Sequence, residues 1–347
     1  MSVCPPRRAG DSTNPSLAPR RRARTPALPA AILLAAGTLG GMSSAKAADW
    51  TVTNLHPAGV GGDSWAFGVS GGQQVGVVGA GGGGRASLWS GTAASRVDLH
   101  PAGFVHSNAN GVGGGQQVGS AVVNQHAHAA LWGGTAASFV DLSPAGSPDS
   151  YAHGVSGGQQ VGQAIVNDLQ RVGMWSGTAA SWVDLTPDGL FGGVAYRISG
   201  GQQVGYTWDG GDFFRASLWS GTAASWVNLT PAGSPDAEAR GVFGGQQVGY
   251  AQVGSVPHAG LWSGTAASWV DLHALLPPGF SESVAQSIWR DASFTYVAGY
   301  GMNDGFQQAL LWTQPVPEPG SATTLAAAGG LFVAARCRRS GRRQSVT

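Results

Sequence analysis

Six side chains that can bind or stack on a ligand recur at one position of a repeated segment. Each stands four residues before a tryptophan, and the six are Arg85, His128, Arg171, Arg215, His258 and Gln308. Because side chains alternate along a β-strand, this spacing places them on the tryptophan's side of a sheet. We expect a ring of polar donors toward one rim of the fold, suited to an acidic polysaccharide. Cation–π packing on neighbouring aromatic rings is the alternative that the same spacing allows.

A glycine-rich hexapeptide, GGQQVG, occurs five times and invites comparison with a phosphate-binding loop. Its copies span residues 71–76, 114–119, 157–162, 200–205 and 244–249. None opens a helix, and none carries the Gly-Lys-Ser/Thr with which a phosphate loop holds its ligand and magnesium. Glycine pairs supply the positive φ angles of two-residue hairpin turns. The hexapeptide therefore predicts a turn that runs into a strand.

Two further patterns invite a metal ion. The segment HAH places His126 and His128 on one side of a strand, but no third ligand is apparent. An aspartate or asparagine before leucine recurs in every unit, as in Asp98-Leu99; calcium or a simple Asx turn would explain it, and we favour the turn. No G-x-S-x-G, no H-E-x-x-H and no isolated carboxylate pair stands out from the repeat. These observations predict no catalytic residue, no bound metal and no cofactor.

Charge is distributed unevenly along the 347 residues. The whole chain has a formal charge of +1, but residues 48–316 contain seven arginines, no lysine and sixteen acidic residues, a net charge of −9. Nucleic acids need a basic surface, so this acidic body argues against them as partners. Cys4 and Cys337 lie outside the body, which excludes a disulfide framework within it. With 57 glycines and 13 tryptophans, the composition indicates an all-β protein of short strands and tight turns.

The body consists of six copies of one unit. The tryptophans from Trp89 to Trp312 recur with steps of 43, 43, 44, 43 and 50 residues, and the sixth hexapeptide has become YVAGYG. Each unit is expected to form four short strands; in residues 195–229 these are AYRIS, QQVGYTW, RASLWS and SWVNL. Four strands in about 43 residues match one blade of a β-propeller.

The ends of the body indicate how a ring would close. The body begins with a fourth strand, residues 51–55, and ends with a third strand, residues 308–313. Pairing of residues 51–55 with 309–312 would close a six-bladed β-propeller and leave no free strand edge. A linear β-solenoid, the alternative, has no use for complementary half-units. The recurring tryptophans of the third and fourth strands fit between stacked sheets, whereas Trp65 and Trp208 fall outside the pattern and serve either local packing or the stacking of sugars.

Both termini have the features of targeting signals. Over residues 1–47, arginines at 20–24 precede an apolar run and an Ala-Lys-Ala site, the order of a secretory signal peptide; a membrane anchor is the alternative. Over residues 315–347, Pro317, Glu318 and Pro319 precede an apolar stretch and an arginine-rich end. This tail resembles the PEP-CTERM sorting signal, although a Pro-rich linker with a basic tail is the alternative. The resemblance implies processing by an exosortase, transient anchoring in the inner membrane, and a Gram-negative host that makes extracellular polysaccharide.

The repeats between residues 50 and 313 resemble the HAF extracellular repeat family. The matching segments are QQVGYT (202–207), QQVGYA (246–251), HAALW (128–132) and HAGLW (258–262). In the other units the histidine of this pattern is replaced by arginine or glutamine. The resemblance implies a secreted, all-β repeat protein and brings no catalytic role with it.

These expectations combine into one functional hypothesis. Residues 48–314 are expected to form a secreted, non-enzymatic propeller at the cell envelope or extracellular surface, acting as a structural or interaction module associated with extracellular polysaccharide. Signal peptidase and exosortase are its expected processing partners. The alternatives are a carbohydrate-binding, lectin-like propeller and a polysaccharide hydrolase or lyase.

Overall fold

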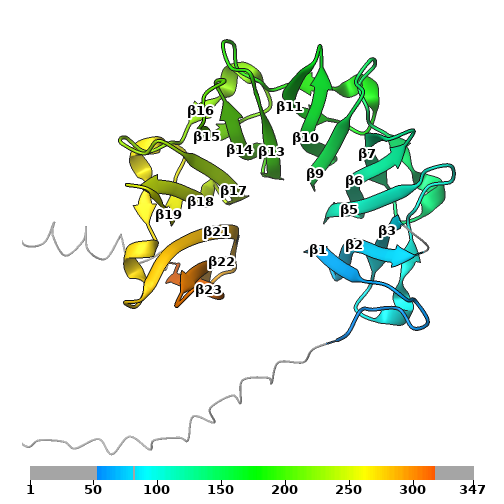
Figure 1. Cartoon of the computed structure of the whole chain (residues 1–347), viewed down its shortest axis with the longest axis horizontal. Helices are drawn as coiled ribbons and strands as arrows, with labels where there is room; N and C mark the ends of the chain where they lie inside the picture. Colours follow the sequence, from blue (N-terminus) through cyan, green and yellow to red (C-terminus); the bar gives the residue numbers. More distant parts are fainter. Residues whose placement is uncertain (1–52, 81–82, 317–347) are drawn as a thin grey trace, which may run out of the picture. The chain divides into compact units, whose positions relative to one another are not determined.

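A computed structural model describes residues 53–80 and 83–316. This part of the chain holds 23 strands in six antiparallel sheets, and each sheet is built from strands that follow one another in the sequence (Figure 1). Five of these sheets have four strands and the last has three. The expected all-β architecture of six repeated, propeller-type sheets is thus confirmed. The predicted signal peptide and most of the predicted sorting tail lie outside the described residues.

The strand bounds repeat with the period of the sequence. In the first three sheets they are β1 (Ser64–Ser70), β2 (Gln73–Ala80), β3 (Gly83–Trp89), β4 (Val97–Asp98), β5 (His106–Gly113), β6 (Gln116–Val123), β7 (His126–Trp132), β8 (Val140–Asp141), β9 (Ser150–Ser156), β10 (Gln159–Val166), β11 (Leu169–Trp175) and β12 (Val183–Asp184). In the last three they are β13 (Gly192–Ser199), β14 (Gln202–Trp208), β15 (Phe214–Trp219), β16 (Val227–Asn228), β17 (Ala237–Phe243), β18 (Gln246–Val253), β19 (Val256–Trp262), β20 (Val270–Asp271), β21 (Phe280–Arg290), β22 (Phe294–Asn303) and β23 (Phe306–Pro315).

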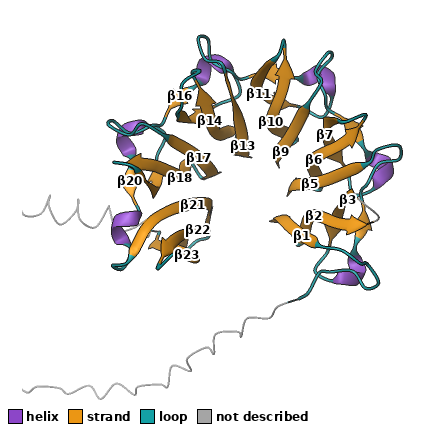
Figure 2. Cartoon of the chain, in the orientation of Figure 1, coloured by secondary structure: helices purple, strands orange, loops and turns teal. Residues whose placement is uncertain are grey.

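The sheets share one orientation around a common centre. The first strand of each sheet lies nearest the centre, and short helices lie at the outer rim (Figure 2). These are single 3-10 turns: η1 (Ala93–Ser95), η2 (Ala136–Ser138), η3 (Ala179–Ser181), η4 (Ala223–Ser225), η5 (Ala266–Ser268) and η6 (His273–Leu275). Within the described residues, no helix has the length and apolar character of a membrane span.

The hexapeptide GGQQVG forms a hairpin turn, as expected, and also ties that turn to the rest of its sheet. In the third sheet, Gly157 and Gly158 have φ angles of +59° and +79°, the pair of positive angles that a two-residue hairpin requires. The buried Gln160 donates from Nε2 to the Gly158 carbonyl oxygen (2.9 Å) and accepts at Oε1 from the Gly177 N–H (2.8 Å). The same two bonds are made by Gln74, Gln117, Gln203 and Gln247. The second glutamine is therefore a structural clamp between two turns.

The fourth strands are shorter than predicted. Of the expected strand 225–229, only Val227 and Asn228 pair with β15. Ser225 instead ends η4, where its hydroxyl accepts from the Ser220 N–H (2.8 Å) and donates to the Thr222 carbonyl oxygen (2.6 Å). This local serine–threonine network satisfies backbone groups within the turn, so the chain enters the sheet two residues late.

The recurring tryptophans fill the spaces between successive sheets, as predicted. Trp132, Trp175, Trp219 and Trp262 are fully buried. Each packs with valine, leucine and alanine side chains of its own sheet and of the sheet before it. Tryptophans of the fourth-strand position support them; the ring centroids of Trp175 and Trp182 are 4.7 Å apart. Burial of large aromatic rings between facing sheets is the main apolar contribution to such a fold.

The seam between the last and first sheets differs from expectation. Thr53–Leu55 belong to no strand, residues 51 and 52 lie outside the described range, and β23 pairs with β22 alone in the part of the chain that the structure describes. The other fourth strands make only two residue pairs each and follow a Gly-Thr-Ala-Ala-Ser turn. The segment before Asn54 lacks that turn. Two residue pairs without a tethering turn fix the register weakly. Among the described residues, the predicted closure by pairing of residues 51–55 with 309–312 is therefore not formed: residues 53–55 lie in no strand, and β23 has one neighbour.

Replacement of Trp175 by alanine should lower the free energy of unfolding by about 3–5 kcal/mol, because it leaves a large cavity between two sheets. Chemical denaturation of the purified chain measures this. Trp208, whose side chain is 37% exposed, provides the control: Trp208→Ala should cost about 1 kcal/mol or less. Equal losses for the two variants would contradict the packing described above.

Candidate functional site in the central channel

The first strands of the six sheets line one cavity, which we call the central channel; the arc of sheets is open between the last and the first sheet (Figure 1). Its volume is about 710 Å³, and all six strands (β1, β5, β9, β13, β17 and β21) contribute to its lining. A smaller adjoining cavity of about 320 Å³ is lined by Tyr196, Arg197, Arg240 and Gln286. Arg197 and Gln286 line both cavities. Pockets for small ligands typically measure about 300–1,000 Å³, so both cavities are large enough for one.

Every channel-lining strand carries a β-bulge at the same position of the repeat. In β5, Ala109 pairs with Gly119 and Gly111 pairs with Val118, which leaves Asn110 as the extra residue. The bulged residues of the six sheets are Phe67, Asn110, His153, Tyr196, Arg240 and Gln286. All six line the central channel or the smaller cavity, and we call them the bulge ring. Because a bulge re-aims its side chain, each sheet presents a different residue to the cavities.

The glycine of the Val-Gly pair in the hexapeptide makes the bulge sterically allowed. A Cβ atom added to Gly119 would overlap the carbonyl oxygen of Asn108, two residues before the bulged Asn110. The same conflict recurs at Gly76, Gly162, Gly205, Gly249 and Gly299. Gly299 belongs to the sixth copy of the hexapeptide, in which most other residues have changed. The steric conflict explains why this copy still has glycine at that position. The repeat thus conserves its bulge even where its other residues have changed.

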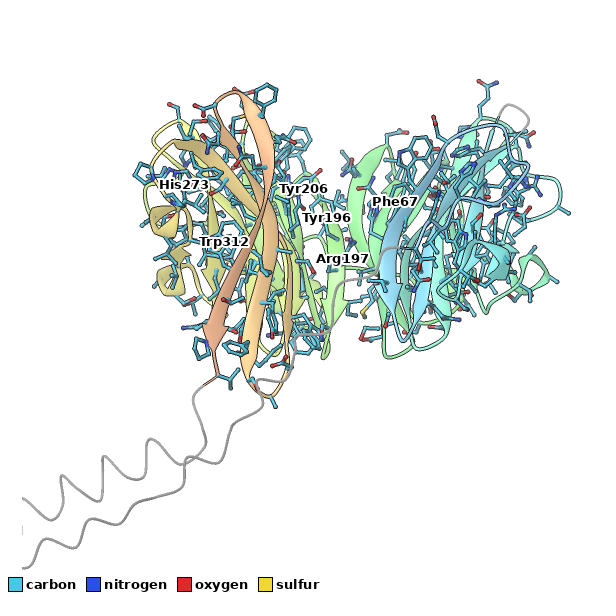
Figure 3. The ribbon with its side chains drawn as sticks, turned by 90° about the horizontal axis from the view of Figure 1, so that it is seen from below. Phe67, Tyr196, Arg197, Tyr206, His273 and Trp312 are labelled. Atoms are coloured by element: carbon cyan, nitrogen blue, oxygen red, sulfur yellow. The ribbon has the colours of Figure 1, made fainter. Side chains whose placement is uncertain are left out.

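Arg197 is an exception to the pattern of the channel wall. The residue after the bulge is glycine in four sheets, where neighbouring first strands approach closely; a Cβ on Gly111 would lie 2.8 Å from the His153 carbonyl oxygen. In β13 this residue is Arg197, and its Nη1 donates to the carbonyl oxygens of Tyr196 (2.9 Å) and His153 (3.3 Å). Figure 3 shows Tyr196, Arg197 and Phe67 beside the central space, from the fourth and first sheets. The fourth sheet therefore places a cation in the channel.

A second arginine, Arg240, lies beside the smaller cavity with its charge already paired. Its Nε donates to Glu238 Oε2 at 3.0 Å, and its guanidinium lies 5.2 Å from the centre of the Tyr250 ring. The Tyr250 hydroxyl shares its one proton between Asp236 Oδ2 (2.9 Å) and Glu238 Oε1 (3.2 Å). Burial, reinforced by the Glu238 carboxylate, raises the pKa of Tyr250 and of Tyr196 above the ordinary range. Both phenols therefore stay protonated, which leaves each hydroxyl able to donate a hydrogen bond.

His153 contributes a neutral imidazole to the channel. Burial, together with the nearby Arg197 charge, lowers its pKa from 6.5 to about 4. Its ring lies 6.1 Å from the Tyr196 ring in an edge-to-face arrangement. At neutral pH it can both donate and accept a hydrogen bond, because neutral imidazole has one nitrogen of each kind.

The bulge ring is suited to binding. It combines two amides, an imidazole, a phenol, a guanidinium and a phenyl ring, whereas the two carboxylates nearest to it are bonded to Tyr250 and Arg240. No group of three or more candidate metal ligands occurs among the described residues. A few convergent polar groups beside an aromatic surface are the usual equipment of a ligand site.

Histidine–serine pairs elsewhere resemble catalytic dyads but are structural. His100 Nδ1 lies 2.8 Å from Ser107 Oγ, while its Nε2 donates to the Phe104 carbonyl oxygen at 3.0 Å. Ser107 is fully buried and accepts from the Ala86 N–H (2.9 Å), so its oxygen is inaccessible to a substrate. Comparable pairs occur at His56–Ser64 and His273–Ser283. In the fourth and fifth sheets, Gly193 and Ala237 replace this serine. The backbone N–H groups of Val172 and Ala216 then donate to the hydroxyls of Thr186 and Thr230 instead.

The six sequence-predicted ring residues lie outside the channel lining. Four of them contact the aspartate of the fourth strand in their own sheet: the pairs are Arg85–Asp98 (2.7 Å), His128–Asp141 (2.6 Å), Arg171–Asp184 (3.9 Å) and His258–Asp271 (2.9 Å). In the fourth sheet, where Asn228 replaces the aspartate, Arg215 turns to Asp209 instead (3.2 Å). Gln308 is exposed on β23. These pairings occupy the side chains, so the bulge ring is the better candidate, and a ligand-facing role for the outer ring stays a prediction.

The aspartate in these pairs has a second task that confirms the predicted Asx turn. Asp98 Oδ1 accepts from the His100 N–H at 2.9 Å, two residues further on. The same bond is made by Asn54, Asp141, Asp184, Asn228 and Asp271. The two histidines of the HAH segment contact different carboxylates, His126 with Asp149 (3.4 Å) and His128 with Asp141. The predicted sorting motif Pro317, Glu318 and Pro319 lies outside the described residues.

The two tryptophans outside the repeat pattern are both partly exposed. Trp65 lies on β1 with 52% of its surface exposed. Trp208, at the end of β14, donates from Nε1 to the Gly211 carbonyl oxygen and packs on Phe191 with ring centroids 5.9 Å apart. Local packing accounts for Trp208.

Sequence reasoning missed the bulge ring, although the sequence contains its signal. Four residues before each Gly-Gly turn stands the middle residue of the triplets AFG, ANG, AHG, AYR and ARG, and AQS corresponds in the sixth unit. The residue at this position is different in every copy of the repeat. Regular alternation along a strand does not predict that the side chain at this position points toward the centre. Its direction follows only from the bulge.

Comparison with known proteins assigns neither a family nor a function to the chain. No family model matches the chain, and no curated protein matches it. Among solved structures it is similar to puromycin hydrolase (12% identity, TM-score 0.46, 76% of this chain and 48% of that one) and to TolB from Acinetobacter baumannii (10%, 0.41, 71% and 64%). It is also similar to a putative TolB from Agrobacterium tumefaciens (16%, 0.44, 71% and 87%). The chain thus spans less than two thirds of the A. baumannii TolB and about half of puromycin hydrolase.

The low pKa of His153 predicts a pH dependence of stability. Since the folded-state pKa (about 4) lies below the ordinary 6.5, the unfolded chain binds more protons between these values, and acid favours unfolding. The contribution of His153 is complete above about pH 6.5 and is lost as the pH falls to about 4. Urea denaturation at pH 7, 5.5 and 4 should show a smaller acid loss for His153→Gln than for the wild type. His126→Gln, which removes an exposed imidazole, is the control; an unchanged acid loss in His153→Gln would contradict the assignment.

Proposed function

We propose that this protein is a secreted, non-enzymatic interaction module that binds its ligand with the bulge ring. One observation carries the proposal: the bulged residue is different in each of the six sheets, and all six bulged residues line the central channel or the smaller cavity beside it. A purely architectural ring has no need for such chemical variety at its centre. Variety at one position of a constant scaffold is what selective recognition requires.

The chemistry of the ring favours carbohydrate as the ligand class. Amide, imidazole and phenol groups can exchange several hydrogen bonds with hydroxyl groups, and the partly exposed Phe67 offers an apolar surface. The amide of Asn110 donates to the Ala152 carbonyl oxygen (3.0 Å), which holds the side chain in place. Preorganised polar groups lose little entropy on binding. A lectin-like function is therefore the more specific form of the proposal, and extracellular polysaccharide is its expected source of ligand.

The proposed location rests on the terminal sequences. Residues 1–47 have the order of a secretory signal peptide, and Pro317, Glu318 and Pro319 with the apolar, arginine-rich tail resemble an exosortase signal. We place the mature protein at the envelope or surface of a Gram-negative bacterium, after passage through signal peptidase and transient anchoring in the inner membrane.

Loss of the ring should abolish ligand capture. Immobilised full-length protein is tested against extracellular polysaccharide from the host, with the triple variant Asn110→Ala, His153→Ala, Gln286→Ala as the comparison. We expect at least a tenfold loss of bound polysaccharide, because each residue supplies polar contacts to the channel. A second triple variant, Arg85→Gln, Arg171→Gln, Arg215→Gln, tests the outer ring. Loss of capture in the outer-ring triple alone would transfer the site there and contradict the proposal.

Delivery is tested by fractionation of the native host with and without its exosortase. The protein should accumulate in the inner-membrane fraction of the exosortase-deficient strain and in the surface fraction of the parent. Replacement of Pro317, Glu318 and Pro319 by alanine should reproduce the deficient pattern. Identical distribution in all three strains would remove the sorting proposal and leave the binding proposal intact.

A further inference from the structure

The lining of the two cavities has a charge opposite to that of the body. Residues 48–316 have a net charge of −9. The residues that line the central channel and the smaller cavity nevertheless include Arg197 and Arg240 and, within the described part of the chain, no aspartate or glutamate. A cleft lined by charge of one sign concentrates counter-ions of the other sign. Within an otherwise acidic molecule, the cavities therefore favour an anion.

Arg197 carries the charge that lacks a partner. Across residues 53–80 and 83–316, its guanidinium contacts no carboxylate; Nη1 donates to two carbonyl oxygens, and Nε and Nη2 have no acceptor within the protein. The Arg197 side chain is exposed to the cavity, and desolvation by the residues around it lowers its pKa. An anion that the guanidinium binds directly stabilises its charged form.

Arg240 cannot serve the same purpose equally well. Its Nε is bonded to Glu238, which is 6% exposed, and the pair is further bonded to Tyr250. The Glu238 carboxylate thus compensates the charge of Arg240. The two arginines border the same smaller cavity, so Arg240 adds a favourable long-range field while Arg197 supplies the free donors.

An aromatic side chain, Phe67, lines the channel on the side across from Arg197. Phe67, on the first of the six sheets, is 46% exposed and lines the same cavity as Arg197, on the fourth (Figure 3). Asn110 and His153 line the cavity from the two sheets between them. A sugar ring presents apolar C–H faces and polar hydroxyl edges, which suit an aromatic wall beside amide and imidazole groups.

The geometry points to a carboxylate-bearing saccharide as the ligand, with the carboxylate on Arg197 and a sugar ring toward Phe67. A guanidinium binds a carboxylate with two parallel hydrogen bonds, and Nε and Nη2 of Arg197 form a free fork of this kind. A volume of about 710 Å³ accommodates a short uronate segment. This inference rests on the proposed binding function and assigns its ligand class: hexuronate, either as a free monosaccharide or as part of an acidic polysaccharide.

Calorimetric titration of the purified full-length protein tests this assignment. The probes are galacturonate, galactose and trigalacturonate, of which the first two differ only in the carboxylate. The wild type should bind galacturonate at least tenfold more tightly than galactose. Trigalacturonate should bind more tightly still if the source is a polysaccharide, and equally if it is the free monosaccharide.

Variants of one residue locate the carboxylate. Arg197→Gln should lower the affinity for galacturonate at least tenfold and leave galactose binding unchanged, and Arg197→Lys should recover part of the loss through its charge. Arg290→Gln is the matched control, because Arg290 bonds to Gln246 and Thr295, which line neither the central channel nor the smaller cavity. Thermal unfolding midpoints of all variants should agree with the wild type.

Three results would overturn the assignment: no uronate binding by the wild type, equal binding of galacturonate and galactose, or full uronate binding by Arg197→Gln. Binding of neutral saccharide that is lost in the Asn110/His153/Gln286 triple would refute the ligand class and leave the proposed function standing. If the wild type binds no saccharide at all, both the ligand class and the proposed carbohydrate-binding function are refuted.

Discussion

The close approach of two neighbouring strands within each sheet controls the rest of the structure. The first strand bulges, and the carbonyl oxygen before the bulge lies where a Cβ atom of the second strand would be, so that position accepts only glycine. Gly76, Gly119, Gly162, Gly205, Gly249 and Gly299 meet this condition in all six sheets. The invariant glycine of the second strand therefore makes room for the bulge in the first strand, while the side chain of the bulged residue is free to vary. This coupling gives the repeat both a regular backbone and a variable centre.

The remaining polar groups of the unit are used within the fold. The second glutamine of the hexapeptide ties two turns together, the Asx residue caps a turn with one oxygen and binds a basic side chain with the other, and histidine or threonine completes the junction between sheets. These bonds satisfy buried donors and acceptors, which would otherwise cost free energy. The bulge position has no such duty in the repeat, which is why it is the position free to acquire a binding role.

Much of the fold could be predicted from the sequence. The 43-residue period, the Gly-Gly turns, the Asx turns and the packing of Trp132, Trp175, Trp219 and Trp262 follow from local chemistry and periodicity. The candidate site did not follow, because a period of two assigns each side chain to one of two faces and a bulge breaks that assignment. The acidic partners of the outer ring were missed for a related reason: Arg85 and Asp98 are thirteen residues apart, and only the pairing of the third and fourth strands brings them together.

The most direct test of this account is a crystal structure of the full-length protein with trigalacturonate. We predict a bulge in each of the six first strands and saccharide in the central channel. A carboxylate should lie about 2.7–2.9 Å from Nε and Nη2 of Arg197, with a sugar ring beside Phe67. Regular first strands without bulges, or saccharide bound at the outer ring of Arg85, Arg171 and Arg215 with an empty channel, would contradict it.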